Sequence, residues 1–170
     1  MGQVMNKSCI ILIGMPGAGK STVGPLLAER KGLSFKDTDT LVKQQDGREL
    51  KTIVVEDGFE AFLEIQQKAI LSQNLNNSVV ATGGSVVKSD ALMRTLKSIG
   101  TVIYLQVDFE LLQQRLATDR KLARAGGQSF KQVFDEREPL YIKYADSIIE
   151  CTGHTPEEIV EKITGVAANK

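Results

Sequence analysis

The residues from Gly14 to Thr22 carry the clearest chemical signal in the chain. They read Gly-Met-Pro-Gly-Ala-Gly-Lys-Ser-Thr, which fits the pattern GxxxxGK[ST], and they lie between an apolar run and a stretch of helical periodicity. Glycines in such a loop let backbone N–H groups turn inward around phosphate oxygens, and the positive end of the following helix dipole adds to the attraction. We predict that Lys20 reaches the β and γ phosphates of a nucleotide and that the Ser21 hydroxyl holds Mg²⁺. The predicted nucleotide-binding residues are Gly17, Ala18, Gly19, Lys20, Ser21 and Thr22.

Two carboxylates follow the next apolar run. Asp37 and Asp39 come after residues 33–35, at the carboxyl end of a predicted strand, which is where ligands bind in open α/β sheets. At i and i+2 the two side chains share one side of an extended segment, so one can face a metal ion and the other an acceptor hydroxyl. We predict that Asp37 is a metal ligand and that Asp39 orients or deprotonates the acceptor. The alternative is that Asp37 or Thr38 only caps the following helix.

Glycines and cations mark two further segments of the predicted site. Residues 81–85 read Ala-Thr-Gly-Gly-Ser at the end of a third apolar run, where Gly83 and Gly84 bring backbone amides to the ligand-binding edge of the sheet. Residues 118–128 combine cations with a Gly-Gly pair, which suits a lid that closes over phosphates. The cations in and near this predicted lid are Arg115, Arg120, Lys121 and Arg124. The alternative is a solvated charged face.

The elements that must position these residues have the pattern of an α/β protein. Short unbroken apolar runs recur at 9–13, 79–81, 101–107 and 147–149, with a weaker one at 33–35. Helical periodicity occurs at residues 23–30, 59–70, 111–116, 133–140 and 159–163. This alternation predicts a parallel sheet buried on both faces between two layers of crossover helices. No repeat or long linker divides the sequence, so we predict a single domain over 1–170.

Composition limits the partners of the chain. The 170 residues include 21 Lys plus Arg and 21 Asp plus Glu, so no net charge favours binding to long nucleic acid or to anionic lipid. The longest apolar run, Cys9 to Ile13, is far shorter than the roughly 20 residues that cross a bilayer. The amino terminus lacks the pattern of a secretion signal, and Cys9 and Cys151 have no metal-binding spacing. We expect a cytoplasmic monomer with reduced thiols and a small-molecule substrate.

The motifs also separate the classes of nucleotide-binding protein. A switch GTPase needs Asp-x-x-Gly after a strand and Asn-Lys-x-Asp for guanine, and neither pattern occurs in the sequence. The chain is too short for a large mechanical ATPase with its additional domains. A small phosphotransferase remains, and a glycine-rich turn that caps a helix without binding phosphate is the structural alternative.

Together, these motifs resemble the shikimate kinase family. The resemblance is carried by GMPGAGKST (14–22), DTD (37–39), GR (47–48), DGFEAF (57–62), ATGG (81–84) and EREPLY (136–141). It implies an adenylate-kinase-like P-loop fold with strand order 2-3-1-4-5, a substrate-binding region over about 37–75, and a short lid. ATP and Mg²⁺ are the implied cofactors, and the implied reaction is the phosphorylation of shikimate to shikimate 3-phosphate in aromatic amino acid biosynthesis. The residues assigned to catalysis are Lys20, Asp39 and Arg120, the last of which also contacts the nucleotide phosphates, and those assigned to the substrate are Asp39, Gly83, Gly84 and Arg137.

Three positions near the predicted substrate site depart from the family pattern. In the Phe-Arg-x-x-Glu helix of the family the arginine grips the substrate carboxylate, whereas here Leu63 and Gln66 stand in place of the two charged residues. Ser85 replaces a third glycine, and the Arg-Pro-Leu-Leu of the lid reads Arg-Lys-Leu-Ala. Removing one of the charged partners of a carboxylate in a buried site lowers the stability of that interaction by roughly 3 kcal/mol or more. A sister kinase for another small hydroxy compound and a degenerate nucleotide-binding regulatory domain therefore stay open, with a nucleotide kinase as a weaker alternative.

Overall fold

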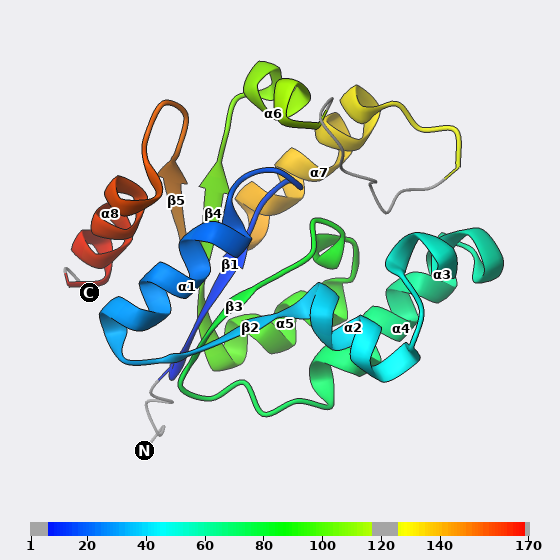
Figure 1. Ribbon diagram of the computed structural model, residues 1–170, viewed down its shortest axis with the longest axis horizontal. Coiled ribbons are helices and arrows are strands. Elements are labelled where there is room, and N and C mark those ends of the chain that lie inside the picture. Colours follow the sequence, from blue (N-terminus) through cyan, green and yellow to red (C-terminus); the bar gives the residue numbers. More distant parts are fainter. Residues whose placement is uncertain (1–6, 117–125, 169–170) are drawn as a thin grey trace.

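The computed structural model describes residues 7–116 and 126–168 and has a five-stranded parallel sheet at its centre (Figure 1). The strands are β1 (Cys9–Ile13), β2 (Ser34–Asp37), β3 (Ser78–Ala81), β4 (Gly100–Gln106) and β5 (Ser147–Glu150). Their order across the sheet is β2-β3-β1-β4-β5, and all four neighbouring pairs are parallel. The expected α/β class and the strand order 2-3-1-4-5 are confirmed.

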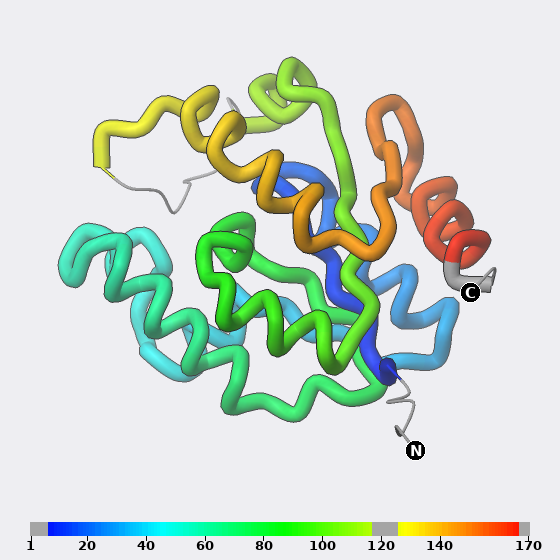
Figure 2. Tube along the Cα trace, turned by 180° about the vertical axis from the view of Figure 1, so that it is seen from behind, coloured from blue at the N-terminus to red at the C-terminus, as the bar shows by residue number. Residues whose placement is uncertain are grey.

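Helices cover both faces of this sheet. On one face α1 (Lys20–Lys31) packs against α8 (Pro156–Ala168), and on the other α5 (Asp90–Ile99) and α7 (Phe130–Tyr144) lie over β4, as the view from behind in Figure 2 shows. The helix α6 (Phe109–Leu116) follows β4, and a short 3₁₀ turn, η1 (Val86–Lys88), precedes α5. Three further helices, α2 (Thr38–Asp46), α3 (Leu50–Asp57) and α4 (Phe59–Leu71), form a group of their own between β2 and β3 in the chain.

Two apolar clusters hold these elements together. The larger one joins the strands to α1, α5, α7 and α8, because β1, β3 and β4 are apolar on both faces and almost wholly buried. The smaller one lies within the α2–α4 group and consists of Val42, Ile53, Phe62, Leu63 and Ala69. The α2–α4 group therefore has an apolar centre separate from the core around the sheet.

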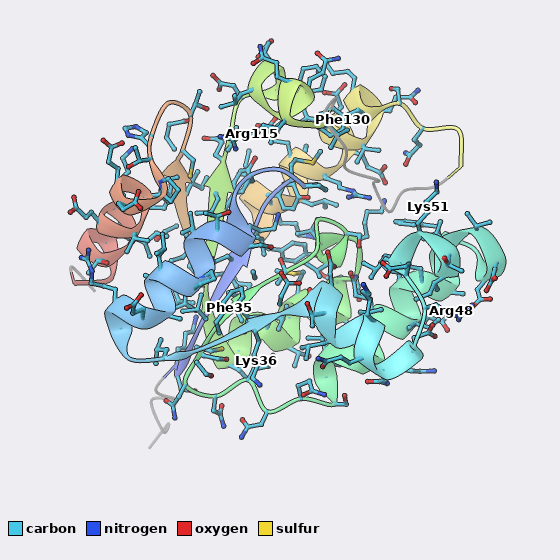
Figure 3. All side chains as sticks on the ribbon, in the orientation of Figure 1. Phe35, Lys36, Arg48, Lys51, Arg115 and Phe130 are labelled. Carbon is cyan, nitrogen blue, oxygen red and sulfur yellow. The ribbon has the colours of Figure 1, made fainter. Side chains whose placement is uncertain are left out.

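A close approach between α1 and β2 brings the first two motifs together. A Cβ atom added at Gly24 would lie 2.4 Å from Cε2 of Phe35, so the missing side chain leaves room for this ring against the helix. Figure 3 labels Phe35 on β2. The carboxyl end of β2 then lies beside the start of α1, and the Ser21 hydroxyl donates a hydrogen bond to Asp37 at 2.9 Å. The spacing of strand and helix thus places the predicted metal ligands side by side.

Arg48 fastens the connection between α2 and α3 (Figure 3). Its guanidinium donates to both carboxylate oxygens of Asp46 at 2.6 and 3.0 Å, to Glu56 at 2.9 Å and to Asp57 at 2.7 Å. These bonds hold the pKa values of Asp46 and Asp57 below their ordinary range. The Gly-Arg and Asp-Gly-Phe segments of the resemblance therefore include a structural ion cluster at this end of the group.

Several features of the fold go beyond the sequence expectations or lie outside them. The sequence periods do not predict α3 or α5, and the helix after Asp37 is anticipated only through its cap. Cys9 and Cys151 are both buried and free. Within residues 7–116 and 126–168, no helix has the length and apolar character needed to cross a membrane. Most of the predicted lid, including Arg120, Lys121 and Arg124, lies outside the described residues.

Candidate active site

The loop between β1 and α1 lies at the carboxyl edge of the sheet and encloses a lysine. Gly17 and Gly19 have φ angles of 87° and 97°, in the left-handed region that glycine adopts without strain. Gly19 is the N-cap residue of α1, so the amino-terminal turn of the helix begins directly at the loop. Lys20 is buried, and its Nζ donates to the carbonyl oxygens of Gly14 at 2.6 Å and Met15 at 2.8 Å. A concave set of backbone donors with one ammonium group is the geometry that binds phosphate.

Asp37 has two roles at the end of β2. One carboxylate oxygen accepts from the backbone N–H groups of Asp39 at 2.9 Å and Thr40 at 3.4 Å, which caps α2. The other oxygen accepts from the Ser21 hydroxyl at 2.9 Å. The capping interpretation and the proximity to Ser21 therefore hold together, because the two oxygens of one carboxylate serve different partners.

Asp39 has an ionisation equilibrium shifted by its surroundings. Its pKa is raised to about 6, chiefly because burial desolvates the carboxylate and also because of the Asp37 charge, while the Lys20 ammonium opposes both effects. A Cβ atom at Gly83 would lie 2.5 Å from Oδ1 of Asp39, so the carboxylate rests directly against the backbone of the loop after β3. A carboxylate with a pKa near neutrality, close to a phosphate-binding lysine, is suited to take a proton.

Hydroxyl groups hold the loop after β3 in place. The backbone N–H of Gly83 donates to Thr38 Oγ1 at 2.9 Å, and the Thr82 hydroxyl donates to the Leu12 carbonyl at 2.8 Å. The Tyr141 hydroxyl donates to the Gly84 carbonyl at 2.6 Å. None of these positioning roles is predicted from the sequence, because the three bonds join residues 45, 70 and 57 positions apart.

Arg137 provides a cation on the α7 side of this loop. It is 2% exposed, and its Nη1 lies 3.3 Å from the position that a Cβ would take at Gly84. Burial lowers its pKa, and the contact with Tyr141, which includes a hydrogen bond, opposes this shift. The absence of side chains at Gly83 and Gly84 thus leaves Asp39 and Arg137 on either side of the same short segment.

The three departures from the family pattern lie near this segment as well. Leu63 and Gln66 are one turn apart on α4, and both are buried. The Ser85 hydroxyl donates to Gln66 Oε1 at 3.0 Å, so the serine and the glutamine form a hydrogen-bonded pair. An uncharged helix surface stands where the family has an arginine and a glutamate.

A cavity borders the phosphate loop on the side of α6 and α8. It has a volume of about 210 Å³ and is lined by Gly17, Ala18, Gly19, Thr22, Val23, Arg115, His154, Pro156 and Ile159. The Nη1 of Arg115, from α6, donates to the Gly17 carbonyl at 2.7 Å (Figure 3). His154 lies between Glu158 Oε2 at 3.2 Å and Lys162 Nζ at 2.9 Å. The sequence predicts no role for His154, since nothing in its immediate neighbours along the chain connects it to the phosphate loop.

The structure brings most of the predicted residues to one edge of the sheet. The loop after β1, the end of β2 and the loop after β3 meet there, and α7 supplies Arg137. The predicted residues that meet at this edge are Lys20, Ser21, Asp37, Asp39, Gly83, Gly84 and Arg137. The predicted phosphate contact of Arg120 stays a prediction.

Comparison with known proteins identifies the family to which this geometry belongs. A family model described as shikimate kinase matches residues 16–168. The chain belongs to the shikimate kinase family. A shikimate kinase of Persephonella marina is 36% identical over 159 residues, which cover 92% of this chain and 96% of the relative. Shikimate kinase 2 of Yersinia enterocolitica is 33% identical over 168 residues, which cover 95% and 96%.

Solved structures of shikimate kinases have the same architecture. The shikimate kinase of Acinetobacter baumannii, in complex with shikimate, superposes with a TM-score of 0.82 at 30% identity and covers 98% of this chain and 96% of its own. The enzyme of Aquifex aeolicus gives a TM-score of 0.78, also at 30% identity, with 95% and 96% covered. As a member of the shikimate kinase family, this chain is a phosphotransferase with an alcohol acceptor and uses ATP as a substrate.

Proposed function

We infer that this member of the shikimate kinase family transfers the γ phosphoryl group of ATP to a hydroxyl of shikimate. One observation carries the inference: the phosphate loop and the acceptor carboxylate meet. Ser21, at the start of α1, donates to Asp37 at 2.9 Å, and the other oxygen of Asp37 accepts from the N–H of Asp39 at 2.9 Å. The Asp39 carboxylate itself rests against Gly83. The shikimate complex of the Acinetobacter baumannii relative supports this choice of acceptor. A phosphoryl group held by the loop would therefore lie beside a hydroxyl held by the carboxylate.

The phosphate loop binds and orients ATP in this proposal. Backbone N–H groups at Gly17 and Gly19 and in the first turn of α1 donate to phosphate oxygens, and that of Ala18 does so in exchange for its hydrogen bond to the Met15 carbonyl at 3.0 Å. Lys20 exchanges its hydrogen bonds to the Gly14 and Met15 carbonyls for bonds to the β and γ phosphates. Its ammonium offsets the negative charge that the backbone donors alone do not neutralise.

We propose that Ser21 and Asp37 hold Mg²⁺; Thr22 follows Ser21 in the first turn of α1. The Ser21 hydroxyl oxygen and a carboxylate oxygen of Asp37 are 2.9 Å apart, and hydroxyl and carboxylate oxygens are the ligands that Mg²⁺ prefers. The residues therefore fit the ion, which would supply positive charge to the β and γ phosphates when bound. Asp37 stays oriented for this task because the start of α2 fixes its second oxygen.

Asp39 is the proposed general base. Ionised above a pKa of about 6, it accepts the proton of the acceptor hydroxyl as that oxygen attacks the γ phosphorus. The new bond joins the acceptor oxygen to phosphorus, the bond between phosphorus and ADP breaks, and the proton is on Asp39. Burial of this carboxylate brings its pKa close to the working pH, where a general base is most effective.

Arg137 and the two glycines are proposed to bind the acceptor. The buried guanidinium provides charge-assisted donors for the shikimate carboxylate. Gly83 and Gly84 leave the space over the loop open, because a side chain at either position would collide with Asp39 or Pro16. The acceptor would thus lie between Asp39 and Arg137.

The rest of the nucleotide is proposed to occupy the cavity beside the phosphate loop. The base of the nucleotide would lie next to Arg115 and His154, which line this cavity. The cavity also adjoins the loop backbone that is proposed to hold the phosphates. We further propose that Arg120, from the predicted lid over 118–128, closes on the phosphates and excludes water.

A second candidate acceptor is favoured by one specific observation. Leu63 offers apolar surface where the family has an arginine for the substrate carboxylate, which leaves Arg137 as the cation described beside Gly84. A sister kinase would phosphorylate a small hydroxy compound that carries less negative charge than shikimate. Both candidates use the same phosphate loop and the same base.

Turnover with defined acceptors decides between the candidates. The protein is incubated with Mg-ATP and either shikimate, related cyclic acids, sugars or sugar acids, and ADP release is followed together with phosphorus NMR of the product. We expect ADP release that depends on shikimate and yields one monophosphate ester. Turnover with a less anionic acceptor and none with shikimate would favour the sister kinase, and nucleotide binding without any turnover would favour a regulatory domain.

A further inference from the structure

A buried carboxamide shares the acceptor space with Asp39. Gln66 is 0% exposed, and its Oε1 lies 3.3 Å from the position that a Cβ would take at Gly83. The same position is 2.5 Å from Oδ1 of Asp39. The amide group of Gln66 and the proposed base therefore border the same small volume above Gly83, although they come from different helices.

One side of this carboxamide is satisfied and the other is not. Oε1 accepts from the Ser85 hydroxyl at 3.0 Å, whereas Nε2 is buried and has no hydrogen-bond partner among the described residues. Burial of an amide N–H without a partner is unfavourable, and such groups in native proteins need an explanation. In the structure Oε1 is the atom that lies beside both Ser85 and Gly83. Because a hydroxyl both donates and accepts, Ser85 can pair with either end of the carboxamide, and a half-turn about the last torsion brings Nε2 to the position of Oε1, where its two N–H groups can serve the serine and a second oxygen.

The surroundings of Gln66 indicate which kind of oxygen it would meet. Leu63, one turn earlier on α4, is apolar and buried, so this position of the helix offers no cation to a carboxylate. The guanidinium of Arg137, beside Gly84, meets that need instead. Asp39 takes the hydroxyl that reacts, and a group next to Asp39 is in reach of the neighbouring hydroxyl on the same ring. An uncharged oxygen next to the reacting one is thus the partner that fits an amide donor.

We propose that Gln66 is a specificity-determining residue of the acceptor site, which selects a vicinal diol by donating a hydrogen bond to the hydroxyl adjacent to the one phosphorylated. Ser85 is its positioning residue. The acceptor class is a ring with two neighbouring hydroxyls and one anionic group, which Arg137 binds. This inference rests on the proposed function, since shikimate is such a compound.

The test removes the amide while keeping its shape. Gln66→Met is close in volume and has no N–H donor, so we expect the KM for shikimate to rise about tenfold, with kcat changed less than about threefold and the KM for ATP unchanged. The matched control is Gln67→Met, at the next position of α4. The Gln67 side chain accepts a hydrogen bond from the Ser89 hydroxyl at 2.7 Å. We expect the control to leave the KM for shikimate unchanged.

An acceptor analogue makes the test specific for the adjacent hydroxyl. With shikimate that lacks this hydroxyl, wild type and Gln66→Met should have equal KM values, because the bond in question is absent from both. Gln66→Glu is the second variant: it keeps the acceptor for Ser85 but loses the donor when ionised, so its KM for shikimate should rise as the pH rises. Thermal unfolding midpoints of all variants check that folding is intact.

The outcomes separate this inference from the proposed function. An unchanged KM for shikimate in Gln66→Met, or an equal rise with shikimate and with its deoxy analogue, overturns the role of Gln66 while the kinase assignment stands. If Gln66→Met instead lowers the unfolding midpoint, lowers kcat and raises the KM values for shikimate and ATP to the same extent, the role of Gln66 is purely structural. That result also overturns the inference. Wild type that is inert toward shikimate overturns the proposed function, and this inference with it.

Discussion

Lys20 is the residue on which phosphoryl transfer most directly depends. Its ammonium is held inside the phosphate loop by two backbone carbonyls, so it is already positioned where phosphate charge accumulates. We expect Lys20→Ala to lower kcat by about a hundredfold to a thousandfold, the usual effect of removing one group that stabilises developing charge. Steady-state ADP release measures this, with Lys31→Ala, an exposed lysine at the end of the same helix, as the control. Near-normal turnover of Lys20→Ala would contradict the assignment.

The raised pKa of Asp39 leads us to expect an acid limb in the pH profile of kcat/KM. Its pKa is raised to about 6, so the carboxylate is protonated below that pH and cannot accept the proton of the acceptor. We expect kcat/KM for shikimate to rise with pH up to about 6 and then level off. Asp39→Asn should lower kcat by about a hundredfold or more and abolish this limb, with little change in the KM for ATP. A limb at pH 6 that persists in Asp39→Asn would assign it to another group.

Asp37 allows the metal role to be separated from the capping role. Asparagine is as good a helix cap as aspartate, so Asp37→Asn keeps the start of α2 while removing a negative charge beside Ser21. We expect the Mg²⁺ concentration for half-maximal activity to rise about tenfold, with an unchanged unfolding midpoint and an unchanged KM for shikimate. Titration of activity with MgCl₂ at fixed ATP measures the shift. An unaltered Mg²⁺ response would leave Asp37 with its capping role alone.

The sequence allows the reactive residues to be predicted but not the residues that hold them. The phosphate loop and the Asp-Thr-Asp segment are contiguous, so their chemistry is visible in a few letters. Thr38, Tyr141 and Gln66 act through contacts with residues 19 to 57 positions away, and a single sequence contains no sign of such pairs. The pairing of Gln66 with Ser85 is the clearest case, because two separate departures from the family pattern prove to be one hydrogen-bonded unit.

At the scale of elements, the distance between α1 and β2 depends on a single missing side chain. Alanine at position 24 would bring a Cβ to 2.4 Å from the Phe35 ring, so the ring, the helix or the strand must shift. We expect Gly24→Ala to destabilise the protein by about 1–3 kcal/mol, as overpacked cores do, and to weaken Mg²⁺-dependent activity by moving Ser21 away from Asp37. Thermal and urea unfolding measure the first effect.

A matched glycine and a compensating change complete this test. Gly165 also lies in a helix, α8, but a Cβ there would meet no atom within 4 Å. Gly165→Ala should therefore stabilise the protein by about 0.5–1 kcal/mol through helix propensity alone. Phe35→Leu combined with Gly24→Ala should recover part of the loss. Equal effects of the two glycine substitutions would show that the contact with Phe35 is unimportant.

The elements that the sequence predicts are those with long apolar patterns. The strands at the centre of the sheet are unbroken runs, and α4 shows a full stripe of buried positions. The helix α3 has one buried residue, Ile53, so it has no periodic stripe to detect. The helix α5 does carry a signal, with Ser89 as its cap and Leu92, Met93 and Leu96 buried, but the pattern is short and lies next to the glycine-rich loop.

For the molecule as a whole, the two apolar clusters support different parts of the candidate active site. The large core fixes the sheet edge with the phosphate loop, Asp37 and the loop after β3, while α4 presents Leu63 and Gln66 from the smaller cluster of the α2–α4 group. An acceptor that contacts both Gln66 and Arg137 would bridge the two parts. We propose that they are one folding domain, in which the smaller part opens locally more often than the sheet.

Hydrogen exchange tests this division of stability. Local opening needs less free energy where few apolar contacts are broken, and α3 has one buried residue and a largely exposed Val55. We expect amides of α3 and the start of α4 to exchange faster than those of β1 and β4, while denaturant unfolding stays a single transition. Shikimate at 100 times its dissociation constant stabilises the bound form by about 2.7 kcal/mol, so exchange in α4 should slow by up to about a hundredfold. ADP with Mg²⁺ should instead protect the first turn of α1. Equal exchange rates in α3 and β4, or protection of β5 and α8 by shikimate rather than of α4, would contradict a substrate-binding part built on the smaller cluster.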